Sequence, residues 1–201
     1  MLLTNVLIAT GSISLLTCIV SLLWLHLLPT GYNVFRDPVS NYAVSKYGYL
    51  YSFQTIATGS TAITLLAILN HLQISLPKKG VVTLGIYALA RLFIFLFPTD
   101  VKPPATIKGR IHAVLAAVTF TGIAMATSSV TPALSANDLW LNASSLLGIA
   151  SKMTVFSAIA FLVTWISKPL RIVAGLVERL IYLGLLFWFS IVFFSLLVHF
   201  L

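Results

Sequence analysis

Asp37, Asp100 and Glu178 are three of only four acidic residues in this chain, and each stands at the end of a long apolar run. Each also has an arginine close by in sequence, namely Arg36, Arg110 and Arg179. Charged groups at the edge of a membrane span are costly unless they pair or line a wet cavity. The placement therefore predicts one polar site that is built from helix ends.

A histidine, His112, follows Asp100 across a turn that contains Pro103 and Pro104. An aspartate and a histidine that meet across such a turn suit general base catalysis or metal binding, although this histidine could merely cap an interface. Neither a cofactor nor the presence of a metal follows from these residues. The candidate catalytic residues are Asp37, Ser40, Asp100, His112 and Glu178.

Arg91 lies seven residues before Pro98, roughly 10 Å below the expected helix end. An unpaired cation at such a depth costs about 2.5 to 3.5 kcal/mol, so we expect an acidic partner: Asp37, Asp100 or Glu178. Arginines near the site disfavour a metal cation and favour an anionic lipid head group. The candidate ligand-binding residues are Arg36, Arg91 and Arg179, around a pocket shared by the acids and His112, with Ser40 at its edge.

A purely structural interpretation of the same residues remains open. Asp37 could be an N-cap that accepts a backbone N–H from Val39 or Ser40, with Pro38 at the first helical position. Glu178 could interact with the macrodipole of the last helix. The polar face would then be a network of helix caps and ion pairs.

The elements that must position these side chains are membrane helices. Hydrophobic residues make up 59% of the chain, charged residues 8%, and the mean hydropathy is +1.04. These values are typical of polytopic membrane proteins and exclude an ordinary soluble domain. We predict an all-α fold, one domain over residues 1–201, in which six transmembrane helices form a compact bundle with short loops. The predicted spans are about 3–28, 50–70, 80–97, 111–130, 147–166 and 180–200.

The connection before the second span predicts a separate short helix. A helix running unbroken from Pro38 to Asn70 would be about 50 Å long, which exceeds the bilayer. We therefore expect a break at residues 46–48. The short helix could form a lid that holds Arg36, Asp37 and Ser40 over the mouth of the bundle.

Polar and small residues within the spans give packing predictions. The second span contains Gln54, Thr55 and Thr58, whose side chains either bond their own helix or line a polar path. Small residues at a spacing of four allow helix backbones to approach closely, so their faces should be interior. These patterns are Thr55 with Gly59, Thr58 with Ala62, Ala113 with Ala117 and Thr121, and Gly122 with Ala126.

The formal net charge of +8 arises from cations that flank the spans. In this position they meet lipid phosphates, so the expected partner is membrane lipid and not nucleic acid. Cys18 is the only cysteine, which excludes an internal disulfide, and we expect it to be a packing residue. The oligomeric state does not follow from the sequence.

Three separated motifs resemble a known family. They are GYxxxRDxVS at residues 31–40, FPxD at residues 97–100 followed by His112, and GLxER at residues 175–179. In this order they resemble the bacterial and archaeal six-span membrane family called domain of unknown function 998. This chain departs from the family pattern at Asn41, where members commonly have an acid, and around Asp138, where they have a basic loop. The resemblance implies a location in the prokaryotic inner membrane, with both termini cytoplasmic and the motifs facing outward.

The family has no agreed activity, so three function classes remain. The first is a membrane-embedded hydrolase or transferase that acts on a lipid head group. The second is a small carrier or lipid-binding protein that holds an anionic ligand without chemistry. The third is a structural or accessory subunit.

Overall fold

The computed structural model describes residues 2–200, which are all-helical without any strand in that range. This range contains six α-helices and three short 3-10 helices. In chain order they are α1 (Leu2–Leu27), η1 (Val39–Val44), α2 (Gly48–His71), α3 (Lys78–Ile94), α4 (Ile107–Ser135), η2 (Leu141–Ala143), α5 (Ser144–Ile166), η3 (Lys168–Val173) and α6 (Ala174–Phe200).

Five of the α-helices are long and apolar enough to cross a membrane, and α3 is the exception. With 17 residues, α3 ends at Ile94, whereas the sequence predicted a span that continues to residue 97. The residue before a proline disfavours helical geometry, and the chain leaves the helix shortly before Pro98. The predicted number of six spans is therefore not reached by length and composition. Five apolar helices are compatible with an integral membrane protein.

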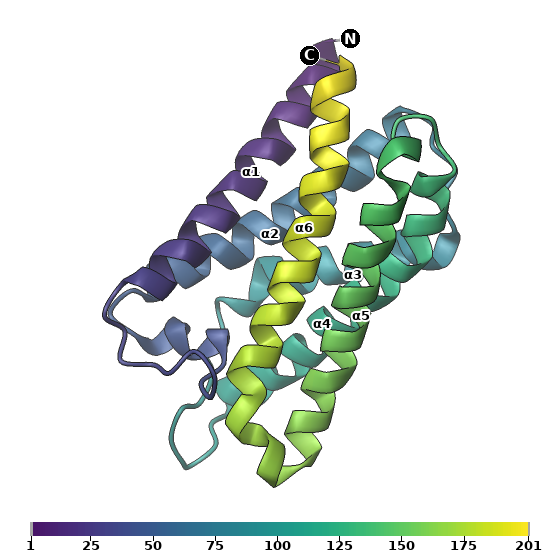
Figure 1. The fold of residues 1–201 in the computed structure, drawn as a ribbon. Coiled ribbons are helices and arrows are strands. Elements are labelled where there is room, and N and C mark those ends of the chain that lie inside the picture. Colours follow the sequence, from purple (N-terminus) through teal and green to yellow (C-terminus); the bar gives the residue numbers. More distant parts are fainter. Residues whose placement is uncertain (1, 201) are drawn as a thin grey trace.

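The three connections that contain or directly precede the sequence motifs lie at the same end of the bundle, and α1 begins and α6 ends at the opposite end (Figure 1). The first of these connections has the predicted break, since η1 stops at Val44 and α2 begins at Gly48. The second joins α3 to α4, and the third joins α5 to α6 through η3. This shared end is where a site made of helix ends can form.

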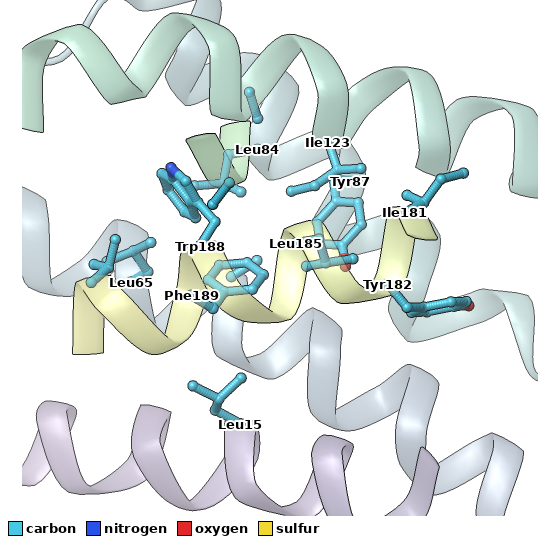
Figure 2. Packing of buried hydrophobic residues seen from close by; sticks show 14 of the residues in the cluster. Leu15, Leu65, Leu84, Tyr87, Ile123, Ile181, Tyr182, Leu185, Trp188 and Phe189 are labelled. Carbon is cyan, nitrogen blue, oxygen red and sulfur yellow. The ribbon is translucent and has the colours of Figure 1, made fainter. Parts of the chain in front are cut away.

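The core is centred on α6, which packs between other helices of the bundle. Figure 2 shows Leu185, Trp188 and Phe189 of α6 between Ile123 of α4 and Leu15 of α1. The Trp188 ring is fully buried, and its Nε1 donates to the Thr131 hydroxyl at 2.9 Å. Satisfying this indole N–H within the core allows a large side chain to be buried without an unpaired donor.

The small-residue faces are interior in three of four cases. Thr55, Gly59, Thr58 and Ala62 are buried, and a Cβ on Gly59 would meet the Ala88 carbonyl of α3. Gly122 and Ala126 are likewise buried. The prediction is wrong for the face of Ala113, Ala117 and Thr121, because Ala113 and Thr121 are exposed on the outside of α4. Spacing alone identifies a smooth face but not which neighbour covers it.

Candidate functional site

A cavity of about 250 Å³ opens among α2, α3, α4, α5, α6 and η1, at the end of the bundle where the connections α1–α2, α3–α4 and α5–α6 lie (Figure 1). We call it the polar cavity. It brings together five of the residues that the sequence singled out, namely Ser40, Arg91, Asp100, His112 and Glu178. Further lining residues were not singled out, and they include Tyr51, Thr119, Phe120, Phe161, Trp165 and Tyr182.

Three other predicted site residues do not line this cavity. Asp37 lies in the first connection, where its Oδ2 accepts the Asn33 backbone N–H at 2.8 Å. Arg36 is largely exposed and contacts Asp37 at 3.3 Å between Nε and Oδ1. Arg179 bonds His26 of α1 and groups of the first connection, as described below. The prediction that all four candidate acids and bases converge with their arginines in one pocket is therefore wrong for these three positions.

Arg91 is 1% exposed, yet its predicted acidic partner is absent. Its Nη2 donates to Gln54 Oε1 at 2.6 Å, and its Nη1 donates to the Tyr182 hydroxyl at 3.1 Å. Within residues 2–200 the one ion pair closer than 4.0 Å is Arg36 with Asp37. The predicted salt bridge of Arg91 is therefore wrong, because neutral side chains of α2 and α6 bond the guanidinium in place of an acid. Arg91 Nε has no hydrogen-bond partner.

His112 stands on the first turns of α4 and is 3% exposed. Its Nδ1 is 2.6 Å from the carbonyl oxygen of Phe97, which can only accept, so Nδ1 is the donor. A neutral imidazole of this tautomer presents a lone pair at Nε2, and that atom has no partner. The predicted pairing of His112 with Asp100 is wrong, since a backbone carbonyl from the FPxD motif holds the ring.

Asp100 instead organises the start of α4. Its two oxygens accept from the Thr106 backbone N–H at 2.7 Å and from the Thr106 hydroxyl at 2.8 Å. The same hydroxyl caps α4 by accepting the Gly109 N–H at 3.0 Å. A Cβ at Gly109 would collide with the Asp100 carboxylate. The acid therefore fixes the connection from which His112 enters the cavity.

Glu178 is 2% exposed, and its Oε2 accepts the backbone N–H of Val39 at 2.7 Å. The residue before η1 makes no side-chain cap, so the predicted capping by Asp37 is wrong. A carboxylate from α6, distant in sequence, satisfies the first free N–H of η1 instead. Glu178 thus lines the polar cavity and at the same time holds Ser40 and its neighbours against α6.

Arg179 completes the attachment of the first connection to α6. Its Nε donates to His26 Nε2 at 2.7 Å, its Nη1 to the Asp37 and Gly175 carbonyls at 2.9 and 2.8 Å, and its Nη2 to the Tyr42 hydroxyl at 2.9 Å. The His26 Nδ1 lies 2.7 Å from the Leu22 carbonyl, which only accepts, so Nδ1 has the ring proton. Because Arg179 only donates, Nε2 is the acceptor and His26 is neutral.

We call this group of contacts the α6 junction: Phe35, Asp37, Val39 and Tyr42 of the first connection, His26 of α1, and residues 175–179 of α6. The Leu176 N–H also donates to the Phe35 carbonyl at 2.9 Å. A Cβ on Gly175 would collide with the Asp37 backbone, which explains why glycine opens the GLxER motif. Two of the three sequence motifs thus contact one another directly.

A buried polar chain extends from Arg91 into α2 and α1. Gln54 Nε2 lies 3.4 Å from the Thr58 hydroxyl, which in turn lies 3.1 Å from Cys18 Sγ. Thr58 and Thr61 also donate to carbonyls of their own helix, at Gln54 and Ala57. Hydroxyl groups of α2 therefore bond carbonyls of their own helix, whereas Gln54 bonds Arg91, which lines the polar cavity.

Aromatic residues form one wall of the cavity, and a basic cleft adjoins its mouth. The Phe120 and Phe161 rings meet edge to face at 5.0 Å between centroids. A second cleft of about 440 Å³ shares Pro38 and Trp165 with the cavity and is lined by Arg36 and Arg171. Anions that approach this end of the molecule therefore meet two exposed arginines before they reach Arg91.

Metal binding gains no support from the arrangement of the side chains. Across residues 2–200, no three His, Cys, Asp or Glu side chains are grouped so that they could hold a metal ion. His112 and Asp100 both line the cavity, but each is bonded to main-chain or hydroxyl groups of its own connection. The buried guanidinium in the same cavity disfavours a cation.

The comparisons with known proteins identify a family but not an activity. The family described as "Protein of unknown function (DUF998)" matches residues 12–195. No curated protein and no solved structure matches the chain. The chain therefore belongs to the DUF998 family, in agreement with the resemblance of its three motifs.

Proposed function

We propose that this chain is an integral membrane protein whose polar cavity binds the anionic head group of a membrane lipid. The observation behind the proposal is Arg91, which is 1% exposed, bonded to two neutral groups, and left with an unpartnered Nε. Arginine stays charged in proteins, and a buried charge needs a counter-charge in contact. A lipid phosphate that entered the cavity would provide it.

The shape of the cavity suits a head group whose chains remain outside. A volume of about 250 Å³ lies just below the range of roughly 300 to 1,000 Å³ that is typical of sites for whole small molecules. Ala113 and Trp165 line the cavity and are also exposed on the outer surfaces of α4 and α5. Acyl chains could leave the cavity there and stay in the bilayer, while Arg36 and Arg171 attract the phosphate at the interface.

Topology forms part of this proposal. We place α3 as a sixth span, about 25 Å long, with the termini in the cytoplasm and the polar cavity on the outer face of the inner membrane. The test is labelling of single cysteines at Ser45, Lys102 and Lys168 in a Cys18→Ala background. All three should react from the outside, and a residue that reacts only from the cytoplasm would refute this topology.

Co-purified lipid tests the binding itself. Native mass spectrometry of protein purified in mild detergent should detect a retained anionic lipid in the wild type and much less of it in Arg91→Gln. Arg110→Gln is the matched control, because Arg110 is exposed on α4 and does not line the cavity. Equal retention by the wild type and both variants, or no retention by any, would contradict the proposal.

Lipid processing by a hydrolase or transferase is a second candidate, favoured by His112, which lines the cavity and has no partner at Nε2. A base in this position could accept a proton from water or from a head-group hydroxyl. Release of water-soluble head group from vesicles of defined lipid, lost in His112→Asn, would establish this activity. A structural role is favoured by the α6 junction alone, and a carrier would bind the same head group without changing it.

A further inference from the structure

Three residues that line the polar cavity each have a buried polar atom without a hydrogen-bond partner: Arg91 Nε, His112 Nε2 and the Thr119 hydroxyl. All three residues are at most 3% exposed. Buried polar groups are almost always paired in native proteins, so unpaired ones that share a cavity indicate missing partners. The hydrogen-bonding character of the three atoms therefore describes the ligand in outline.

The three atoms need hydrogen-bond partners of different kinds. Arg91 Nε can only donate, so it needs an acceptor, and the charge makes an anionic oxygen the best one. In a neutral imidazole whose Nδ1 proton is donated to Phe97, His112 Nε2 can only accept. The Thr119 hydroxyl can serve either role. A matching ligand has an anionic oxygen and at least one O–H or N–H donor within the same small volume.

The two acidic residues that line the cavity narrow the choice of ligand. Asp100 and Glu178 also line it, so a compact anion without donors would face two carboxylates as well as Arg91. Hydroxyl groups donate to carboxylates and to a neutral imidazole, and they keep the phosphate apart from both acids. Quaternary ammonium head groups have no donor for His112.

From this complementarity, which rests on the proposed function, we infer that the ligand is a phosphodiester lipid with free head-group hydroxyls, of the glycerol-phosphate kind. The phosphate contacts Arg91, a hydroxyl donates to His112 Nε2, and the diacyl part stays outside between α4 and α5. The charge of Arg91 and the composition of the chain would suit any anionic lipid. The requirement for a hydroxyl comes from His112 Nε2, which needs a donor.

The test uses the full-length protein, delipidated in detergent, and measures the affinity for three added lipids through the shift in melting temperature. Dioleoyl phosphatidylglycerol has the phosphodiester charge and two hydroxyls. Dioleoyl phosphatidylethanol has the same charge and no hydroxyl, and dioleoyl phosphatidylcholine has no net charge and no donor. We expect phosphatidylglycerol to bind about fivefold to tenfold more tightly than phosphatidylethanol, which corresponds to the loss of one or two hydrogen bonds.

Two variants assign the preference to single atoms. Asparagine at position 112 keeps a donor for the Phe97 carbonyl but has no acceptor at the place of Nε2. His112→Asn should therefore weaken phosphatidylglycerol to the level of phosphatidylethanol and leave phosphatidylethanol unchanged. Arg91→Gln should weaken both lipids alike.

The outcomes separate this inference from the proposed function. Equal affinity of the wild type for phosphatidylglycerol and phosphatidylethanol, both above phosphatidylcholine, would overturn the hydroxyl requirement and leave anion binding in place. Equal affinity for all three lipids would overturn both. A preference for phosphatidylglycerol that survives in His112→Asn would overturn the role of His112.

Discussion

The α6 junction and the polar cavity are neighbours at one end of the bundle, share Glu178, and contain the same types of residue. They differ in how their hydrogen bonds are used. In the junction, Arg179 makes four hydrogen bonds within the protein, and His26 bonds through both ring nitrogens. In the cavity, Arg91 and His112 each keep one buried nitrogen without a partner. Each region has one arginine and one histidine, but only one of the two regions is complete.

This difference separates structural polar groups from candidate binding groups. An arginine whose three nitrogens all donate within the protein stabilises the fold, and a ligand would have to break those bonds to use it. A buried arginine with an N–H group that has no acceptor lowers the stability of the fold until a ligand accepts that hydrogen bond. We therefore expect substitutions in the junction to act on stability and substitutions in the cavity to act on ligand binding.

Arg179→Leu should have the largest effect on stability. The change removes bonds to α1, to the first connection and to α6 itself, and it takes the Arg179 donor away from the Asp37 carbonyl, the Tyr42 hydroxyl and the His26 imidazole. We expect a loss of about 3 to 5 kcal/mol in the free energy of unfolding, measured by denaturation in detergent. Arg110→Leu, on the exposed face of α4, should change it by less than about 0.5 kcal/mol. Similar losses in both would show that the junction does not hold the fold.

Glu178 should show an intermediate effect that depends on the replacement. Glu178→Ala removes the acceptor of the Val39 N–H and should cost about 2 to 3 kcal/mol. Glu178→Gln keeps an acceptor oxygen and should cost about 1 kcal/mol or less. Comparison of the two melting curves distinguishes the contribution of the hydrogen bond to Val39 from the contribution of the negative charge. Equal losses of stability would mean that the charge, and not the hydrogen bond, stabilises the fold.

Gly175→Ala should have a smaller effect that depends on close packing. Its Cβ would collide with the Asp37 backbone, and overpacking of this kind costs about 1 to 3 kcal/mol. Gly148→Ala in α5 is the matched control, because nothing lies within 4 Å of the added methyl. There the gain in helix propensity should stabilise by up to about 1 kcal/mol. A neutral Gly175→Ala would show that the first connection can move away from α6.

The sequence predicted the placement of the cavity better than its contacts. Apolar segment lengths and loop order placed Asp100, His112 and Glu178 at one end, since helix ends on the same side must come close in a small bundle. The break before Gly48 also followed from length alone. These features depend on chain distances along helices, which composition and spacing describe well.

Partner choice could not be predicted in the same way. Arg91 of α3 bonds Gln54 of α2 and Tyr182 of α6, and the order of helices around α3 is not encoded by hydrophobic periodicity. The Val39 N–H is bonded by Glu178 from the far end of the chain, although Asp37 is the nearer acid. Local cap rules name the type of group that is needed, but the tertiary fold decides which residue supplies it.

The most direct test of this account measures the melting temperatures of Arg91→Gln and Glu178→Ala with and without added phosphatidylglycerol. In lipid-free detergent we expect Arg91→Gln to cost about 1 kcal/mol or less, because its lost hydrogen bonds are offset by no longer burying a charge, and Glu178→Ala to cost more. With lipid added, Glu178→Ala should still gain stability, whereas Arg91→Gln should gain little or none. A full lipid-dependent gain in Arg91→Gln would contradict the assignment of Arg91 as the binding group of the polar cavity.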